Sequence, residues 1–493
     1  MRSVRHVFAT LAAGGAAIVL VCAALTPGAR AGTAPSRSQV LLLMSPSRPS
    51  LRASLLAYAD SIRPRQPVYA GEGLYYAGVS YRRASLQDSA IACLRRSVEL
   101  RGADEERLAF ADAQLFRRGP GDLEEAIAML EQAVDPNSGL TMNPTAYQAR
   151  LAWAKLLAGD TQRANELFKP LETALDLDPV WGYRMARAFV EAGDAKRALA
   201  ALQPLAVASR EQDEEIMTLA AKAFERFGDK GRLEAGISKS IAARDLSEGK
   251  TIGAMGGRRV RFSAFDGFPL GGVVAGADEK LRRAAVVLWA PGDTVASYDS
   301  LTVALSHAGW AVMLMEIRGS GWSAAPACPF AESWVGREDA MQTISARDVR
   351  DALRALALTA KIDTTRFLLA GVGATVPIAV EAAELDARVP ALVLMSPAPA
   401  AVERGTLRER VRRLQRPIYF SSAPEDFPQF EVTDALYQAG DRARSRVGDV
   451  NAPGTGARPF RRDSKALHRL VEWLDETMPA RAPAPRSAKQ GSR

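Results

Sequence analysis

Cysteine and histidine are scarce in this chain, which holds three of each among 493 residues. Because Cys22 falls in an N-terminal segment that we expect to be removed, only Cys93 and Cys328 remain. Two cysteines cannot form a framework of several disulfides, so a packed core has to hold the fold. Thiolate and imidazole are the usual ligands of transition metals, and the few present here form no cluster in the sequence. We therefore expect no metal site and no cofactor.

The central part of the chain has little net positive charge, although the formal net charge of the whole chain is +8. Three of these charges lie in residues 1–31 and four in the tail that follows Ala480, which leaves +1 for the rest. A nearly neutral body lacks the basic surface on which nucleic-acid binding depends. We expect no nucleic-acid partner. The tail, residues 479–493, is rich in Pro, Ala and Ser and is predicted to be disordered.

The first 31 residues have the pattern of a secretory signal peptide. Arg2 and Arg5 precede an apolar run from Val7 to Leu25, and Ala29-Arg30-Ala31 supplies small residues for cleavage. This pattern predicts export to the periplasm or the medium, with no membrane span left after cleavage. The alternative is an uncleaved N-terminal membrane anchor, because the apolar run is nearly long enough to cross a bilayer.

A repeat of about 35 residues runs through the first half of the chain. Each unit begins at a turn, followed five residues later by a small or apolar residue and nine residues later by a larger apolar one. The five turns are Ser85, Gly121, Gly159, Gly193 and Gly228. Four of them are Gly-Asp pairs, in which glycine can end one helix and aspartate can cap the next. The sequence therefore predicts pairs of helices over residues 70–245.

This pattern resembles the tetratricopeptide repeat. A small residue stands seven positions before four of the turns: Gly78, Ala152, Ala186 and Ala221. The second unit departs from the pattern, with Gln114 at the small position and an inserted Gly119-Pro-Gly. The resemblance implies a solenoid that binds a protein or peptide partner. The alternative is an array that only packs against the rest of its own chain. Residues 32–69 are expected to form a tether and a first helix, and the glycine-containing segment 246–258 a linker.

From Arg259 onwards short apolar runs alternate with helical segments. The strands that we expect are 260–265, 270–274, 284–289, 310–316, 367–370, 391–395 and 417–420. Helices are expected near 299–308 and 346–357 and around Trp473. Such alternation predicts a mostly parallel sheet with helices on both faces. The predicted fold class is a multidomain α + α/β chain, in which a helical repeat solenoid precedes an α/β domain over residues 259–478.

The strand, turn and helix that begin at Arg366 match the setting of a nucleophile elbow, G-x-S-x-G. The turn here is Gly371-Val-Gly-Ala-Thr375, so Gly373 stands where the serine belongs. Arg318-Gly-Ser-Gly and Leu288-Trp-Ala-Pro-Gly-Asp occupy further characteristic positions. The domain thus resembles the α/β-hydrolase fold.

The resemblance places the nucleophile at Gly373, one oxyanion donor at the Ala374 backbone and the acid at Asp426. The histidine would fall in Pro453-Gly-Thr455, where many relatives carry His-Gly-Thr, so its position is taken by Pro453. Glycine has no hydroxyl and proline no imidazole, and both nucleophile and base are therefore missing. The resemblance implies a pseudo-hydrolase.

Two hydroxyl residues and two histidines are the other candidates for the nucleophile and the base. Ser396 and Thr375 are expected at the carboxyl edge of the sheet, where open α/β sheets carry their sites. His307 ends a helical segment and His468 lies on the outer face of the final helix, so both are away from the position of a base. Glu425 next to Asp426 does not predict a metal site, since neighbouring loop residues seldom converge.

Three functions follow from these patterns. The first is an exported protein-binding scaffold whose hydrolase-like domain is inactive and keeps a ligand pocket near Gly373. The alternative is an envelope hydrolase of esters or amides that uses a non-standard nucleophile such as Ser396. A third possibility is that both halves form one surface for assembling an envelope complex. The double replacement at Gly373 and Pro453 favours the first over the second.

Overall fold

A computed structural model describes residues 49–83, 86–135, 138–139, 144–172, 179–210, 214–228, 230–324, 338–398, 406–426 and 429–480. The predicted signal peptide, Cys328 and most of the predicted tail lie outside these residues. Within them, no helix has the length and apolar character needed to span a membrane. The chain divides into two compact units, residues 1–113 and 114–493.

Helices follow one another in pairs through the first half, after a first helix α3 (Pro49–Ile62). The pairs are α4 (Pro67–Arg83) and α5 (Gln87–Leu100), α6 (Asp104–Arg117) and α7 (Asp122–Val134), α8 (Pro144–Leu157) and α9 (Thr161–Phe168), α11 (Pro179–Ala192) and α12 (Ala195–Ser209), and α13 (Glu214–Phe227) and α14 (Lys230–Ala254). The helical character and the turns at Gly121, Gly159, Gly193 and Gly228 are confirmed, whereas the predicted turn at Ser85 lies outside the described residues. Assignment to the tetratricopeptide family stays a prediction.

The turn residues adopt the backbone conformation that the sequence predicts. Gly121, Gly159 and Gly193 have φ values of 78°, 84° and 83°, in the left-handed region that glycine tolerates best. Asp160 and Asp194 then cap the following helices, accepting hydrogen bonds from backbone N–H groups three residues on at 3.2 and 3.3 Å.

The predicted small positions are confirmed only in part. Gly78 faces Leu94, and a Cβ on this glycine would lie 2.5 Å from Leu94 Cγ. Ala152 and Ala186 are fully buried. Ala221 is exposed, because the face of α13 that enters the core carries Ala220 and Ala223 instead.

The segment 246–258 is not an irregular linker, because α14 continues through it to Ala254. Ile252 and Met255 are buried in one of the two cores of the sheet. Glu248 is 4% exposed and forms ion pairs with Arg210 and Arg259 at 2.8 and 2.7 Å. Tertiary contacts therefore outweigh the helix-breaking tendency of the glycines in this stretch.

Eight strands form one sheet in the order β1-β2-β4-β3-β5-β6-β7-β8. Only β2 runs against the others. The strands are β1 (Arg258–Ser263), β2 (Pro269–Ala275), β3 (Arg282–Trp289), β4 (Trp310–Glu316), β5 (Ile362–Val372), β6 (Leu392–Met395), β7 (Ile418–Ser422) and β8 (Arg446–Asp449). The mostly parallel sheet is confirmed, and β8 is the strand that the sequence did not predict.

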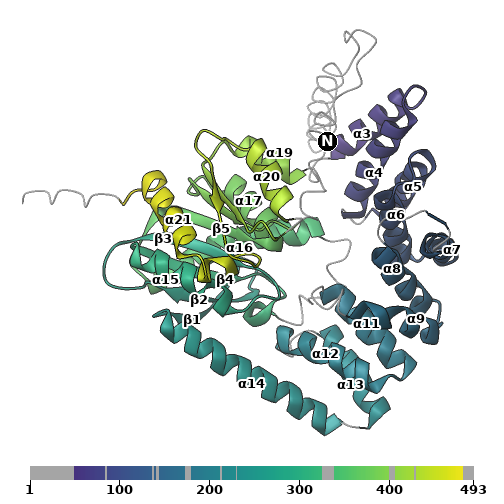
Figure 1. Cartoon of the computed structure of the whole chain (residues 1–493), viewed down its shortest axis with the longest axis horizontal. Coiled ribbons are helices and arrows are strands. Elements are labelled where there is room, and N and C mark those ends of the chain that lie inside the picture. Colours follow the sequence, from purple (N-terminus) through teal and green to yellow (C-terminus); the bar gives the residue numbers. More distant parts are fainter. Residues whose placement is uncertain are drawn as a thin grey trace, which may run out of the picture. The chain divides into compact units, whose positions relative to one another are not determined.

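Helices cover both faces of this sheet (Figure 1). One face packs against α16 (Glu338–Thr359), α17 (Val376–Leu385), α19 (Thr406–Leu414) and α20 (Gln429–Ala439). The other packs against the end of α14, α15 (Asp299–His307) and α21 (Ser464–Thr477). Because β3 to β8 are parallel, the loops that leave their carboxyl ends meet at one edge, which holds the candidate site.

Candidate functional site

The turn after β5 keeps the shape of a nucleophile elbow. Gly373 has a φ of 55° and opens a short 3-10 turn that leads directly into α17. The Thr375 hydroxyl accepts a hydrogen bond from the Val372 N–H at 2.9 Å and lies 3.2 Å from the Leu288 carbonyl oxygen. Thr375 is fully buried and braces the turn, so it is not an exposed nucleophile.

A side chain at Gly373 would meet few neighbours among the described residues. A Cβ placed on this glycine would have one neighbour within 4 Å, the Cβ of Ala290 at 3.8 Å. Ala290 lies in the loop after β3, where an oxyanion donor would be expected. Its backbone N–H instead donates to the Tyr298 hydroxyl at 2.8 Å. Gly373 therefore presents no side-chain hydroxyl, and the neighbouring Ala290 N–H already has a hydrogen-bond acceptor.

Ser396 and Asp426, which follow β6 and β7, lie next to each other. The Ser396 hydroxyl hydrogen-bonds the Asp426 carboxyl. The same hydroxyl accepts a hydrogen bond from the Gly456 N–H at 2.8 Å. Ser396 is 2% exposed and has a φ of 43°, which is uncommon for a residue with a side chain. The serine is thus held by partners on two sides and closed off from solvent.

Burial dominates the electrostatics of Asp426. The residue is 7% exposed, and its Oδ2 atom has no hydrogen-bond partner within the described part of the chain. Burial raises the pKa of this carboxyl, and the hydrogen bond from Ser396 offsets part of that rise. Glu425 is exposed, so the two acids do not form a pair. No group of three metal-ligating side chains occurs among the described residues.

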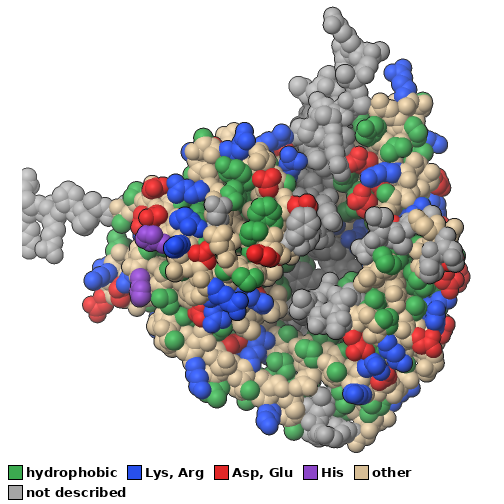
Figure 2. All heavy atoms as spheres, viewed as in Figure 1, with side chains coloured by type: hydrophobic (Ala, Val, Ile, Leu, Met, Phe, Trp, Pro, Cys, Tyr) green, Lys and Arg blue, Asp and Glu red, His purple; other side chains and the backbone are tan. Residues whose placement is uncertain are grey.

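Neither described histidine belongs to this edge of the sheet. His468 is 75% exposed on α21 and lies 3.2 Å from Glu472 on the same helix. His307 is exposed at the end of α15. Figure 2 shows histidine side chains, in purple, at the surface of the face that it draws. Pro453 is exposed as well, and the residue of its loop that touches Ser396 is Gly456. The contact with Ser396 thus falls three residues after the position that the sequence singled out.

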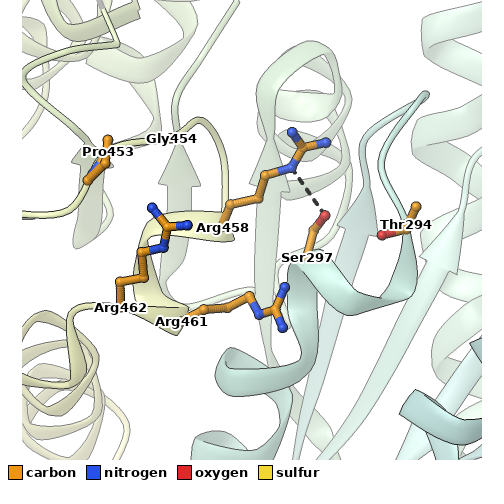
Figure 3. Close-up of a pocket in the computed structure, with 7 residues that line it drawn as sticks. All are labelled: Thr294, Ser297, Pro453, Gly454, Arg458, Arg461 and Arg462. Atoms are coloured by element: carbon orange, nitrogen blue, oxygen red, sulfur yellow. Dashed lines mark hydrogen bonds between the residues drawn. The ribbon is translucent and has the colours of Figure 1, made fainter.

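A cavity of about 480 Å³ opens between the loop after β3 and the loop after β8. Its lining includes Thr294 and Ser297 from the first loop and Arg458, Arg461 and Arg462 from the second (Figure 3). Gly373 is not among the lining residues. The signal in the sequence that could have indicated this cavity is the presence of three arginines within five residues just before the final helix.

Comparisons with known sequences give little coverage. No family model matches the chain. Phycocyanobilin lyase subunit alpha of Picosynechococcus sp. is 30% identical over 131 residues, which are 26% of this chain and 46% of that protein. The chain thus spans about half the length of the curated relative that it matches.

Structural neighbours over part of the chain are α/β hydrolases and esterases. The esterase domain of a Rhodothermus marinus protein has a TM-score of 0.34 and 16% identity and covers 45% of this chain and 98% of its own. The α/β hydrolase GrgF from Penicillium sp. has a TM-score of 0.34 and 13% identity and covers 45% and 99%. At these scores we transfer neither activity nor residue roles from the neighbours.

Proposed function

We propose that the hydrolase-like domain is catalytically inactive and that the protein works as an exported protein-binding scaffold. The observation that carries this proposal is Gly373, which holds the elbow conformation and offers no hydroxyl. Acyl transfer by the serine mechanism needs a nucleophile and a base within hydrogen-bond reach of each other. The described part of the carboxyl edge offers no histidine as base.

The rival function, hydrolysis through Ser396, has one observation in its favour. Ser396 donates to a buried carboxyl whose pKa is raised, and a carboxylate with a raised pKa can act as a base. Against this stands the 2% exposure of Ser396, because a nucleophile has to be reached by the carbonyl that it attacks. We therefore interpret the contact between Ser396 and Asp426 as structural.

Ester turnover separates the two functions. Purified protein without the predicted signal, residues 32–493, would be assayed with a short-chain p-nitrophenyl ester beside its Ser396→Ala variant. We expect both rates to equal the buffer rate. Turnover that disappears in Ser396→Ala would establish the hydrolase instead.

The scaffold part of the proposal is supported by the five consecutive helix pairs within residues 67–254. A stack of such pairs presents an extended surface to a protein or peptide segment. Export rests on the residue pattern of the first 31 positions.

Photo-crosslinking on the whole chain tests where a partner binds. Single photoreactive residues would replace exposed side chains, either on the helix pairs or on the sheet domain, and react with envelope extract. We expect adducts from positions within 70–245. Adducts formed from positions within 259–478 alone would place binding on the sheet domain.

A further inference from the structure

The cavity at the carboxyl edge has an unusual lining for a pocket of its size. Ligand pockets of about 300–1,000 Å³ are mostly lined by apolar side chains. This one, at about 480 Å³, is lined by three arginines and two hydroxyl residues, together with Pro453 and Gly454. The arginines are Arg458, Arg461 and Arg462. None of the lining residues is acidic. The charge that faces the cavity is therefore positive.

Arg458, one of the arginines that line the cavity, is held in place by neighbouring side chains. Arg458 pairs with Asp293 at 2.6 Å, and its Nε donates to Ser297 Oγ at 3.3 Å. Asp293 in turn accepts the Tyr298 hydroxyl at 2.9 Å. These bonds fix the Arg458 guanidinium before any ligand arrives, which lowers the entropic cost of binding.

The other two guanidinium groups have binding capacity left. Arg461 Nε lies 3.3 Å from Asp299 Oδ1, a single contact for a group with five N–H donors. Arg462 is exposed, and its side chain has no hydrogen-bond or ion-pair partner among the described residues. Figure 3 shows the three side chains leaving one short segment opposite Thr294 and Ser297.

We propose that this cavity binds a small molecule through a phosphate monoester group. A phosphate monoester presents three acceptor oxygens and a charge near −2, and guanidinium groups bind such oxygens in bidentate fashion. A carboxylate has only two acceptor oxygens. Its oxygens would accept fewer hydrogen bonds than the cavity can donate from Arg458, Arg461, Arg462 and Ser297. This inference goes beyond the scaffold function, and its failure would leave that proposal standing.

Isothermal titration calorimetry with phenyl phosphate tests the inference on residues 32–493. We expect saturable binding to the unaltered chain and at least tenfold weaker binding to Arg462→Gln. Arg442→Gln removes an exposed arginine outside the cavity and serves as the matched control, with binding unchanged. Equal thermal unfolding midpoints of the two variants would show that both remain folded.

Three results would overturn the inference. The first is the absence of saturable heat with phenyl phosphate. The second is an equal loss of affinity in Arg442→Gln, which would indicate general charge attraction. The third is benzoate binding as tightly as phenyl phosphate, which would show that the cavity does not recognise a phosphate group. Partial retention of binding by Arg462→Lys, which keeps the positive charge but lacks the planar guanidinium group, would support the inference.

Discussion

Asp426 is a buried acid at the carboxyl edge of the sheet, and its surroundings differ from those of the acid in a serine hydrolase. In a serine hydrolase the acid receives a hydrogen bond from histidine, whereas here it receives one from Ser396 and keeps Oδ2 unpartnered within the described chain. The sequence identified Asp426, Ser396 and Gly373 as residues of one sheet edge. It could not show that the serine closes on the acid, because thirty residues separate them and only the pairing of β6 with β7 brings them together.

The raised pKa of Asp426 makes folding stability depend on pH. A carboxyl that binds its proton more tightly in the folded chain contributes its full stabilisation below the unfolded pKa, which is 3.8 for aspartate. That contribution is lost as pH rises through the folded-state pKa. We predict that the free energy of unfolding, relative to the Asp426→Asn variant, falls over this rise in pH.

Urea unfolding at a series of pH values measures this difference. Glu425→Gln removes the adjacent, exposed carboxyl and is the control, for which we expect no such pH-dependent difference. A constant offset between wild type and Asp426→Asn at every pH would contradict the prediction.

At the scale of elements, local signals were read more reliably from the sequence than tertiary ones. The Gly-Asp turns at Gly121, Gly159 and Gly193 and the Asp266-Gly267 hairpin between β1 and β2 depend on neighbouring residues, and these are present. The strand β8 was missed because its four residues, Arg446–Asp449, include one β-branched side chain. The segment around Gly249 and Gly253 was misread because burial of neighbouring side chains decides its helical state.

The cap at the start of α9 gives a test at this scale. Asp160 accepts a hydrogen bond from the Arg163 N–H, and its loss should destabilise α9 by about 1 kcal/mol. We predict that Asp160→Ala raises amide hydrogen exchange in α9 roughly fivefold, with Asp160→Asn close to wild type because asparagine caps equally well. Unchanged exchange in Asp160→Ala would show that packing alone holds this helix.

At the scale of the whole molecule, the sequence indicated two kinds of structure but not how the chain divides. The division falls within α6, and the later helices belong to the same compact unit as the sheet. Trp322 contributes to joining the later helices to the sheet. The Cζ atoms of Arg210, in the helical segment, and of Arg259, in β1, lie 3.9 and 4.2 Å from the centroid of its ring. Contacts between residues more than a hundred positions apart have no signature in a single sequence.

We propose that the described part of the carboxyl edge of the sheet holds no working nucleophile. Incubation of residues 32–493 with a fluorophosphonate, followed by intact mass measurement, tests it most directly, because such reagents modify activated serines covalently. The account predicts an unchanged mass under conditions that fully label an active serine esterase. A single adduct that disappears in Ser396→Ala would show that the domain has rebuilt a nucleophile and would contradict the account.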